Sequence, residues 1–128
     1  MTATATGLLV PELPIVAPDA TVVAKDASAT IAVTEFAKNI TNTGAITSAT
    51  FTFPAASSVA GMPIRFYLTV DQIVKITPAS GEKIFLAGSG VASKYLQIAG
   101  VIGNFVDIFC DGMKFLVTKY SGVLTKET

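Results

Sequence analysis

Histidine and tryptophan are absent from the 128-residue chain, and cysteine occurs once. The lack of histidine removes the commonest general base, the Ser-His and Cys-His dyads and the commonest zinc ligand. We therefore expect a protein that is not an enzyme and that holds neither a cofactor nor a metal. Cys110 cannot form an intrachain disulfide, and its place at the end of an apolar run predicts a core residue rather than a nucleophile.

Charged residues are also scarce, at 14% of the chain against 51% hydrophobic residues. Soluble domains usually carry about 25% charged residues. A chain of this composition cannot cover its whole surface with charge, so we expect part of the surface to be hidden against neighbouring molecules. Nine basic and nine acidic residues give a formal charge of zero, which supplies no cationic field for a phosphate backbone, so nucleic acid is not an expected partner.

Long apolar runs are missing as well. No segment approaches the roughly 20 apolar residues that a membrane-crossing helix needs, so we expect no membrane partner. Residues 1–13 contain no Lys or Arg and do not resemble a secretory signal, which favours synthesis in the cytoplasm. The length matches one compact folding unit.

Prolines mark the N-terminal part of the chain. Pro11, Pro14 and Pro18 interrupt an apolar stretch, which excludes a helix and favours an extended arm. Such an arm has few internal partners and is expected to lie on another surface, although an ordinary first edge strand is an equal alternative. We assign the arm and first strands to residues 1–45 and a compact β body to residues 46–128. The predicted arm interface consists of Leu8, Leu9, Val10, Leu13, Ile15 and Val16.

The body is rich in β-branched and aromatic residues, which occur in short runs separated by Pro, Gly, Ser and Asp. Residues 49–53 and 64–70 alternate strictly and predict half-buried strands, and residues 74–77, 83–86 and 94–99 are shorter candidates. Residues 33–40 predict a short helical turn. The pattern predicts an all-β fold, an antiparallel sandwich or barrel of jelly-roll-like or β-tulip-like type, with an extended N-terminal arm.

The strongest local signal is Asp111-Gly112, which lies between two strand-like runs and predicts a two-residue type I′ hairpin. In that register the core side pairs Cys110 with Met113, Ile108 with Phe115 and Val106 with Val117. The other side pairs Phe109 with Lys114, Asp107 with Leu116 and Phe105 with Thr118. Phe105, Phe109 and Leu116 are therefore predicted to form a subunit interface, with the chain's own arm as an alternative cover.

Residues 47–122 resemble the β-rich modules of bacteriophage virion surface proteins, such as head decoration or cement proteins and tail-fibre modules. The similarity rests on Thr50-Phe51-Thr52-Phe53-Pro54-Ala55-Ala56, Gly61 before Phe66-Tyr67-Leu68, Ile76-Thr77-Pro78 before Gly81-Glu82-Lys83-Ile84, and Cys110-Asp111-Gly112 with Phe115-Leu116-Val117 and Gly122. Such modules often carry Trp in the closing strand and near the end, where this chain has Phe115 and Leu124.

The resemblance implies a structural protein of the virion without enzymatic activity, often a homotrimer. Its arm or edge strands would bind neighbouring subunits, the major capsid protein or another virion protein. A capsid decoration or cement protein is the leading hypothesis. The alternative is a tail-fibre or tail-tip receptor-binding module, whose loops at residues 80–83 and 87–93 would contact a host surface glycan. Tyr67, Tyr95 and Tyr120 could contribute to such a surface, although three tyrosines are ordinary in a β domain.

Overall fold

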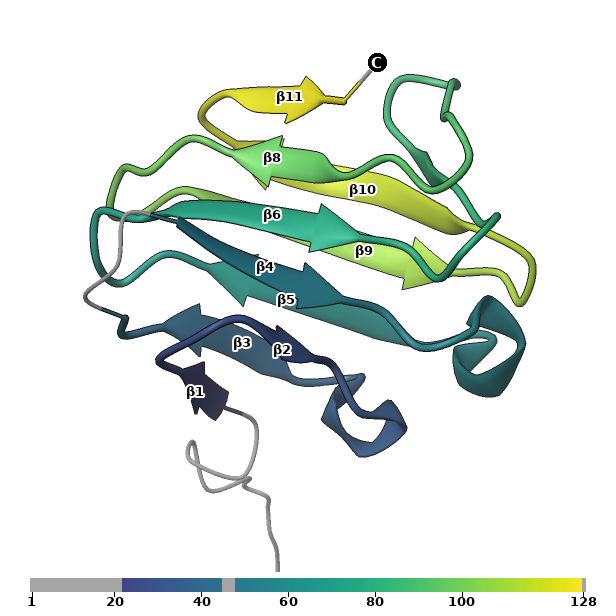
Figure 1. The fold of residues 1–128 in the computed structure, drawn as a ribbon, viewed down its shortest axis with the longest axis horizontal. Helices are drawn as coiled ribbons and strands as arrows, with labels where there is room; N and C mark the ends of the chain where they lie inside the picture. Colours follow the sequence, from purple (N-terminus) through teal and green to yellow (C-terminus); the bar gives the residue numbers. More distant parts are fainter. Residues whose placement is uncertain (1–21, 45–47, 128) are drawn as a thin grey trace, which may run out of the picture.

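The computed structural model describes residues 22–44 and 48–127 (Figure 1). Their regular structure consists of β-strands and two short 3-10 helices, η3 (Val33–Glu35) and η4 (Ala56–Val59), which confirms the prediction of an all-β fold. The strands are β1 (Val22–Lys25), β2 (Ala29–Thr30), β3 (Asn39–Asn42), β4 (Ser48–Thr52), β5 (Pro63–Tyr67), β6 (Ile73–Thr77), β7 (Ile84–Phe85), β8 (Leu96–Ile98), β9 (Phe105–Cys110), β10 (Phe115–Ser121) and β11 (Leu124–Lys126).

The strands form two sheets, each of which mixes parallel and antiparallel pairs. The six-stranded sheet has the order β1-β3-β5-β9-β10-β7, and the five-stranded sheet has the order β11-β8-β6-β4-β2. Parallel pairing joins β1 to β3, β3 to β5 and β7 to β10 in the first sheet, and β2 to β4 and β4 to β6 in the second. The predicted antiparallel arrangement is therefore wrong for these pairs.

The parallel pairs result from the way in which the chain moves between the sheets. From β1 to β6, successive strands alternate between the two sheets, and each strand from β3 onward lies parallel to the strand two places before it. Alternation of apolar residues along a half-buried strand looks the same whether its neighbour is parallel or antiparallel. The pattern in the sequence therefore predicts the strands but does not reveal their direction.

The two sheets lie one in front of the other (Figure 1). Their facing side chains form one buried apolar cluster. Every second residue is buried in β4 and in β9, as the alternating sequence predicts. Phenylalanine rings lie at the centre of the cluster. The ring centroid of Phe53 is 4.5 Å from that of Phe115 and 5.3 Å from that of Phe36, and the centroids of Phe51 and Phe66 are 5.8 Å apart. Full burial of one such side chain stabilises a fold by about 1.5–3 kcal/mol, so these rings hold the two sheets together.

The hairpin between β9 and β10 has a wider turn than the predicted one. Its loop spans residues 111–114, and β10 begins with Phe115 opposite Cys110. The Asp111 Oδ1 atom accepts hydrogen bonds from the backbone N–H groups of Met113 and Lys114, at 2.8 and 2.9 Å, and these bonds stabilise the wider loop. The predicted register is thus wrong by two residues, and Met113, expected in the core, is 80% exposed.

A bulge at Thr118 changes the register a second time, so that Lys119 lies opposite Asp107. The predicted pairs on the outer side of this hairpin are therefore wrong as well: Phe109 faces Leu116, and Phe105 faces Ser121. A shift by two residues leaves each side chain on its original face of the sheet. Phe109 and Leu116 consequently remain on the side that points away from the core, and Phe105 shares that side because it alternates with the buried residues of β9 in the same way as Phe109.

The N-terminal part of the chain is described only from Val22 onward. The six residues of the predicted arm interface, between residues 8 and 16, lie outside the described residues. Residues 22–44 add β1 and β3 to one sheet and β2 to the other, and the boundary at residue 45 stays a prediction. The buried Asn42 side chain ties this part to the body, because it accepts the Thr69 N–H at 2.8 Å and donates to Gln72 Oε1 at 3.0 Å and to the Val70 carbonyl at 3.3 Å.

Candidate interaction surface

The outer face of the six-stranded sheet carries three rows of side chains, each of which crosses several strands. The first row is apolar and consists of Pro63, Phe109, Leu116 and Phe85. The second contains the polar residues Asn39, Arg65, Asp107 and Lys119, and it ends at the exposed Val22 of β1. The third consists of Thr41, Tyr67, Phe105 and Ser121. We name these rows together the aromatic face.

The predicted interface residues fall on this face. Phe109 and Leu116 are direct cross-strand neighbours, and Phe105 lies on the same side of β9 as Phe109 but in the third row. All three side chains are half-buried in the single chain, which leaves part of each ring or aliphatic group open to solvent. Their role as a subunit contact stays a prediction.

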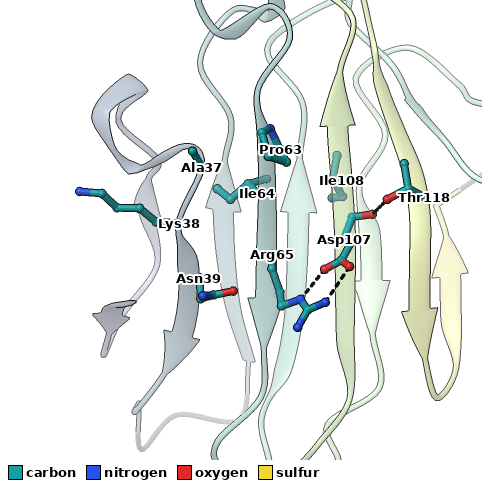
Figure 2. A pocket seen from close by; sticks show the side chains of 9 residues that line it. All are labelled: Ala37, Lys38, Asn39, Pro63, Ile64, Arg65, Asp107, Ile108 and Thr118. Atoms are coloured by element: carbon teal, nitrogen blue, oxygen red, sulfur yellow. Dashed lines mark hydrogen bonds and ion pairs between the residues drawn. The ribbon is translucent and has the colours of Figure 1, made fainter. Parts of the chain in front are cut away.

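An ion pair occupies the centre of the aromatic face (Figure 2). Arg65 Nε donates to Asp107 Oδ1 at 2.5 Å, and Arg65 Nη2 donates to Asp107 Oδ2 at 2.8 Å. The guanidinium also lies over the Phe105 ring, 4.8 Å from its centroid, and its hydrogen bonds to Asp107 raise the pKa of Arg65. Because the two side chains are 42% and 24% exposed, solvent screens the pair, which contributes about 1 kcal/mol or less to stability.

An open pocket of about 320 Å³ lies beside this pair. Figure 2 shows the Asn39 amide and the Asp107 carboxylate directed toward Arg65, whereas the Lys38 ammonium points away. The pocket is lined by Ala37, Lys38, Asn39, Pro63, Ile64, Arg65, Asp107, Ile108 and Thr118. Carboxylate oxygens accept hydrogen bonds, and amide and guanidinium groups donate them, so the pocket has the groups needed to bind a neutral polyhydroxy ligand.

The outer face of the five-stranded sheet has a different composition. Its outward side chains are Thr30, Ser48, Thr50, Thr52, Ile73, Lys75, Thr77, Gln97 and Thr125. The Lys75 ammonium lies over the Tyr95 ring, 4.9 Å from the centroid. Hydroxyl and amide side chains are well solvated, so this face can stay in contact with water at little cost.

Two further reactive side chains, Cys110 and Glu82, make contacts within the fold. Cys110 is fully buried, donates its thiol to the Ala56 carbonyl at 3.2 Å, and has a pKa that burial raises, which confirms the prediction of a core residue. Glu82 accepts the Ala56 N–H at 2.9 Å. In residues 22–44 and 48–127, no three His, Cys, Asp or Glu residues lie close enough together to hold a metal ion. The same residues contain no helix with the length and apolarity that a membrane crossing requires.

The regions considered for glycan binding lie in several places. The loops at residues 80–83 and 87–93 are neighbours, since the Gly81 N–H donates to Ser93 Oγ at 2.7 Å. The tyrosines do not share a surface: Tyr67 is on the aromatic face, Tyr95 packs under Lys75 by the other sheet, and Tyr120 lies near the end of β10.

Sequence reasoning missed two features of the aromatic face. Phe85 completes the apolar row, but its strand has only two residues and leaves no alternating pattern. Arg65 and Asp107 occupy outward positions of alternating runs, yet they are 42 residues apart, and only knowledge of the β5–β9 pairing could join them.

Comparisons with known proteins do not assign this chain to a family. Searches of family models, curated proteins and solved structures found no significant match.

Proposed function

We propose that the chain is a structural virion protein of a bacteriophage, a capsid decoration or cement protein. In this role it binds and stabilises the shell through its N-terminal arm and through contacts within a homo-oligomer, expected to be a trimer. The partner is the major capsid protein or another virion protein. The observation that carries the proposal is the aromatic face, where Phe85, Phe109 and Leu116 form a continuous half-exposed row.

The aromatic face has the composition of an interaction surface. Residues that dominate binding energy are most often aromatic or arginine, and they lie near the centre of an interface. Here the Arg65 guanidinium is already held by Asp107 and by the Phe105 ring, so little side-chain entropy is lost when a partner covers it. The charge of Arg65 is balanced locally, which makes its burial less costly than burial of a lone cation.

The low charge content of the chain supports the same proposal. A stable contact between two proteins buries about 800 Å² on each side, and a chain with 14% charged residues gains by covering such an area. Repetition of one contact by symmetry adds avidity, so that individually weak joints can brace a shell.

The direct test is co-sedimentation of the purified chain with empty shells of the phage that carries it, together with the melting temperature of those shells. We expect the chain to pellet with the shells and to raise their melting temperature. The variant Phe109→Glu should lose most of this binding, whereas Thr50→Glu on the other sheet should retain it. A chain that stays in the supernatant and is a monomer by light scattering contradicts the proposal.

The pocket beside Arg65 favours a second candidate function, a tail-fibre or tail-tip module that recognises a host surface glycan. Asn39, Arg65 and Asp107 offer both donors and acceptors for sugar hydroxyl groups. This candidate predicts binding to host cells or to extracted surface polysaccharide, with loss of binding in Asp107→Ala. Binding to cells without binding to shells would favour it over a decoration protein.

A further inference from the structure

Strand β10 lacks a neighbour along much of one edge. β7 pairs with Phe115 and Leu116 only, and beyond them β10 is bonded to β9 on one side, with no strand of the described residues on the other. The Phe115 N–H donates to the Lys83 carbonyl at 3.0 Å on the β7 side, so the backbone of Val117, two residues further on, faces the open side too. An unpaired strand edge of this kind is a template for the addition of another strand.

A second pocket lies along this open edge. It has a volume of about 440 Å³ and is lined by Leu86 and Ala87, which follow β7, and by residues 117–120 of β10. Leu86 and Val117 are partly buried and pack against the core, and Tyr120 is 47% exposed. Strand-addition sites combine main-chain hydrogen bonds, which give affinity, with pockets for alternate side chains, which give specificity. The edge of β10 offers both.

The edge also limits what can be added. The bulge at Thr118 bends the strand, and Lys119 places a charge on it. Bulges and edge lysines are devices that prevent long edge-to-edge pairing between sheets. The site therefore suits a short apolar segment and disfavours open-ended stacking of whole sheets.

The chain itself contains a segment with the required composition. Residues 13–17 read Leu-Pro-Ile-Val-Ala and are followed by Pro18. Proline is tolerated in an edge strand where its nitrogen faces solvent. Backbone N–H groups of successive residues in a strand point to opposite edges. Pro14 and Pro18 are four residues apart, so both can face solvent while the N–H groups of Leu13, Ile15 and Ala17 face β10.

The positions of the two edges indicate that the segment comes from another molecule. β1, the first described strand after this segment, lies at the opposite edge of the same sheet, with β3, β5 and β9 between it and β10. A strand spacing of about 4.8 Å places β10 about 19 Å from β1. The six residue steps from Val16 to Val22 reach about 20 Å at full extension, which leaves no length to pass over the side chains of the sheet.

We propose that residues 117–121 of β10 form a strand-acceptor site for residues 13–17 of a second copy of this chain. The proposal rests on the proposed function, in which the arm anchors the protein, and it identifies the surface that the arm binds. Because the donor and the acceptor lie at different edges, each contact is head-to-tail, and repetition around an axis closes a ring such as a trimer.

The test is cross-linking between two purified single-cysteine variants of the full chain, mixed in equal amounts. Both carry Cys110→Ala, so that the only thiols are the engineered ones. The donor is Ile15→Cys, the acceptor is Thr118→Cys, and a short bis-maleimide joins thiols that lie near each other. We expect a cross-linked dimer from this mixture, and Ser121→Cys provides a second acceptor probe in case Thr118→Cys does not fold.

The matched control is Thr30→Cys, an exposed threonine in edge strand β2 of the other sheet, and it should give no dimer above the level of random collision. A dimer with Phe109→Cys in place of the two β10 probes would overturn the acceptor site, because the arm would then lie on the aromatic face. Absence of any dimer would overturn it as well. Shell co-sedimentation of the unmodified chain reports separately on the proposed function, so failure of one proposal is distinguishable from failure of the other.

Discussion

The two outer faces of this molecule are built on the same core but differ in nearly every outward residue. The six-stranded sheet presents Phe85, Phe109 and Leu116, whereas the five-stranded sheet presents threonines, as in the cross-strand pair of Thr52 and Thr77. Packing explains the inward residues of both sheets equally well. Packing does not require the outward residues of the two sheets to differ, and the proposed protein partner on one face would account for the difference.

The two faces also differ in how their charged side chains are held. Arg65 is held in a two-bond pair with Asp107 at the centre of the aromatic face, whereas the Lys75 ammonium on the other sheet lies over the Tyr95 ring. A paired and stacked guanidinium is suited to burial under a partner, and a flexible ammonium is suited to water.

The largest expected effect comes from the core that both faces share. Phe53 lies 4.5 Å from Phe115 and 5.9 Å from Phe66, so Phe53→Ala should leave a cavity and lower the free energy of unfolding by about 3–5 kcal/mol. Urea denaturation followed by circular dichroism measures this loss. A variant that unfolds in two steps, one for each sheet, would show that the sheets do not share a core.

The second-largest effect is expected from substitutions on the aromatic face, compared with equivalent substitutions on the other sheet. Phe109→Glu with Leu116→Glu should weaken self-association by at least about 2 kcal/mol, or roughly thirtyfold in Kd, because a charge replaces apolar contact area. The control is Thr52→Glu with Thr77→Glu, which puts the same two charges on a cross-strand pair of the other sheet. Sedimentation equilibrium measures both variants. Equal weakening by the two pairs would remove the distinction between the faces.

A smaller effect is expected from the central ion pair. Asp107→Asn keeps the shape of the side chain but removes its charge, and should lower stability by about 0.5–1 kcal/mol because the pair is partly exposed. Lys75→Gln on the opposite face is the control and should change stability by less. Thermal unfolding at low and high salt is the measurement, and the Asp107→Asn effect should shrink as salt rises.

The smallest effect concerns the border of the aromatic face, where the Lys114 ammonium lies 5.8 Å from the Phe85 ring centroid. The hydrogen bond from Lys114 lowers the pKa of Asp111 from 3.8 to about 2. Since the folded pKa is depressed, the stabilisation by Asp111 is present above about pH 4 and is lost as the pH falls toward 2. Asp111→Asn should therefore flatten the decrease in melting temperature between pH 4 and 2.

The sequence predicts those features of the fold that depend on neighbouring residues in the chain. Alternation in residues 49–53 identified β4, and alternation around Ile108 placed Phe105 and Phe109 on one outward face, because side-chain direction depends only on the strand itself. Strand direction depends on the sheet in which the preceding strand lies, and no local pattern encodes it. The predicted register of β10 is wrong because the chain forms a four-residue loop, which the Asp111 side chain stabilises, in place of a two-residue turn.

The same distinction between local and distant interactions applies to the candidate surface. Phe109 and Leu116 were identified because the hairpin is local and an error of two residues preserves its faces. Phe85 and the Arg65–Asp107 pair depend on strand pairings between distant parts of the chain, which the sequence pattern does not contain. The open edge of β10 is likewise visible only once the two-residue length of β7 is known.

The order of strands in the six-stranded sheet has a consequence for the timing of synthesis. β9 and β10, which join β5 to β7 in space, follow both strands in the sequence, so a nascent polypeptide that stops before residue 105 holds only separate fragments of this sheet. Neither the aromatic row nor the edge of β10 exists until residues 105–121 have been synthesised. A growing chain therefore cannot form the proposed contacts from its earlier strands alone.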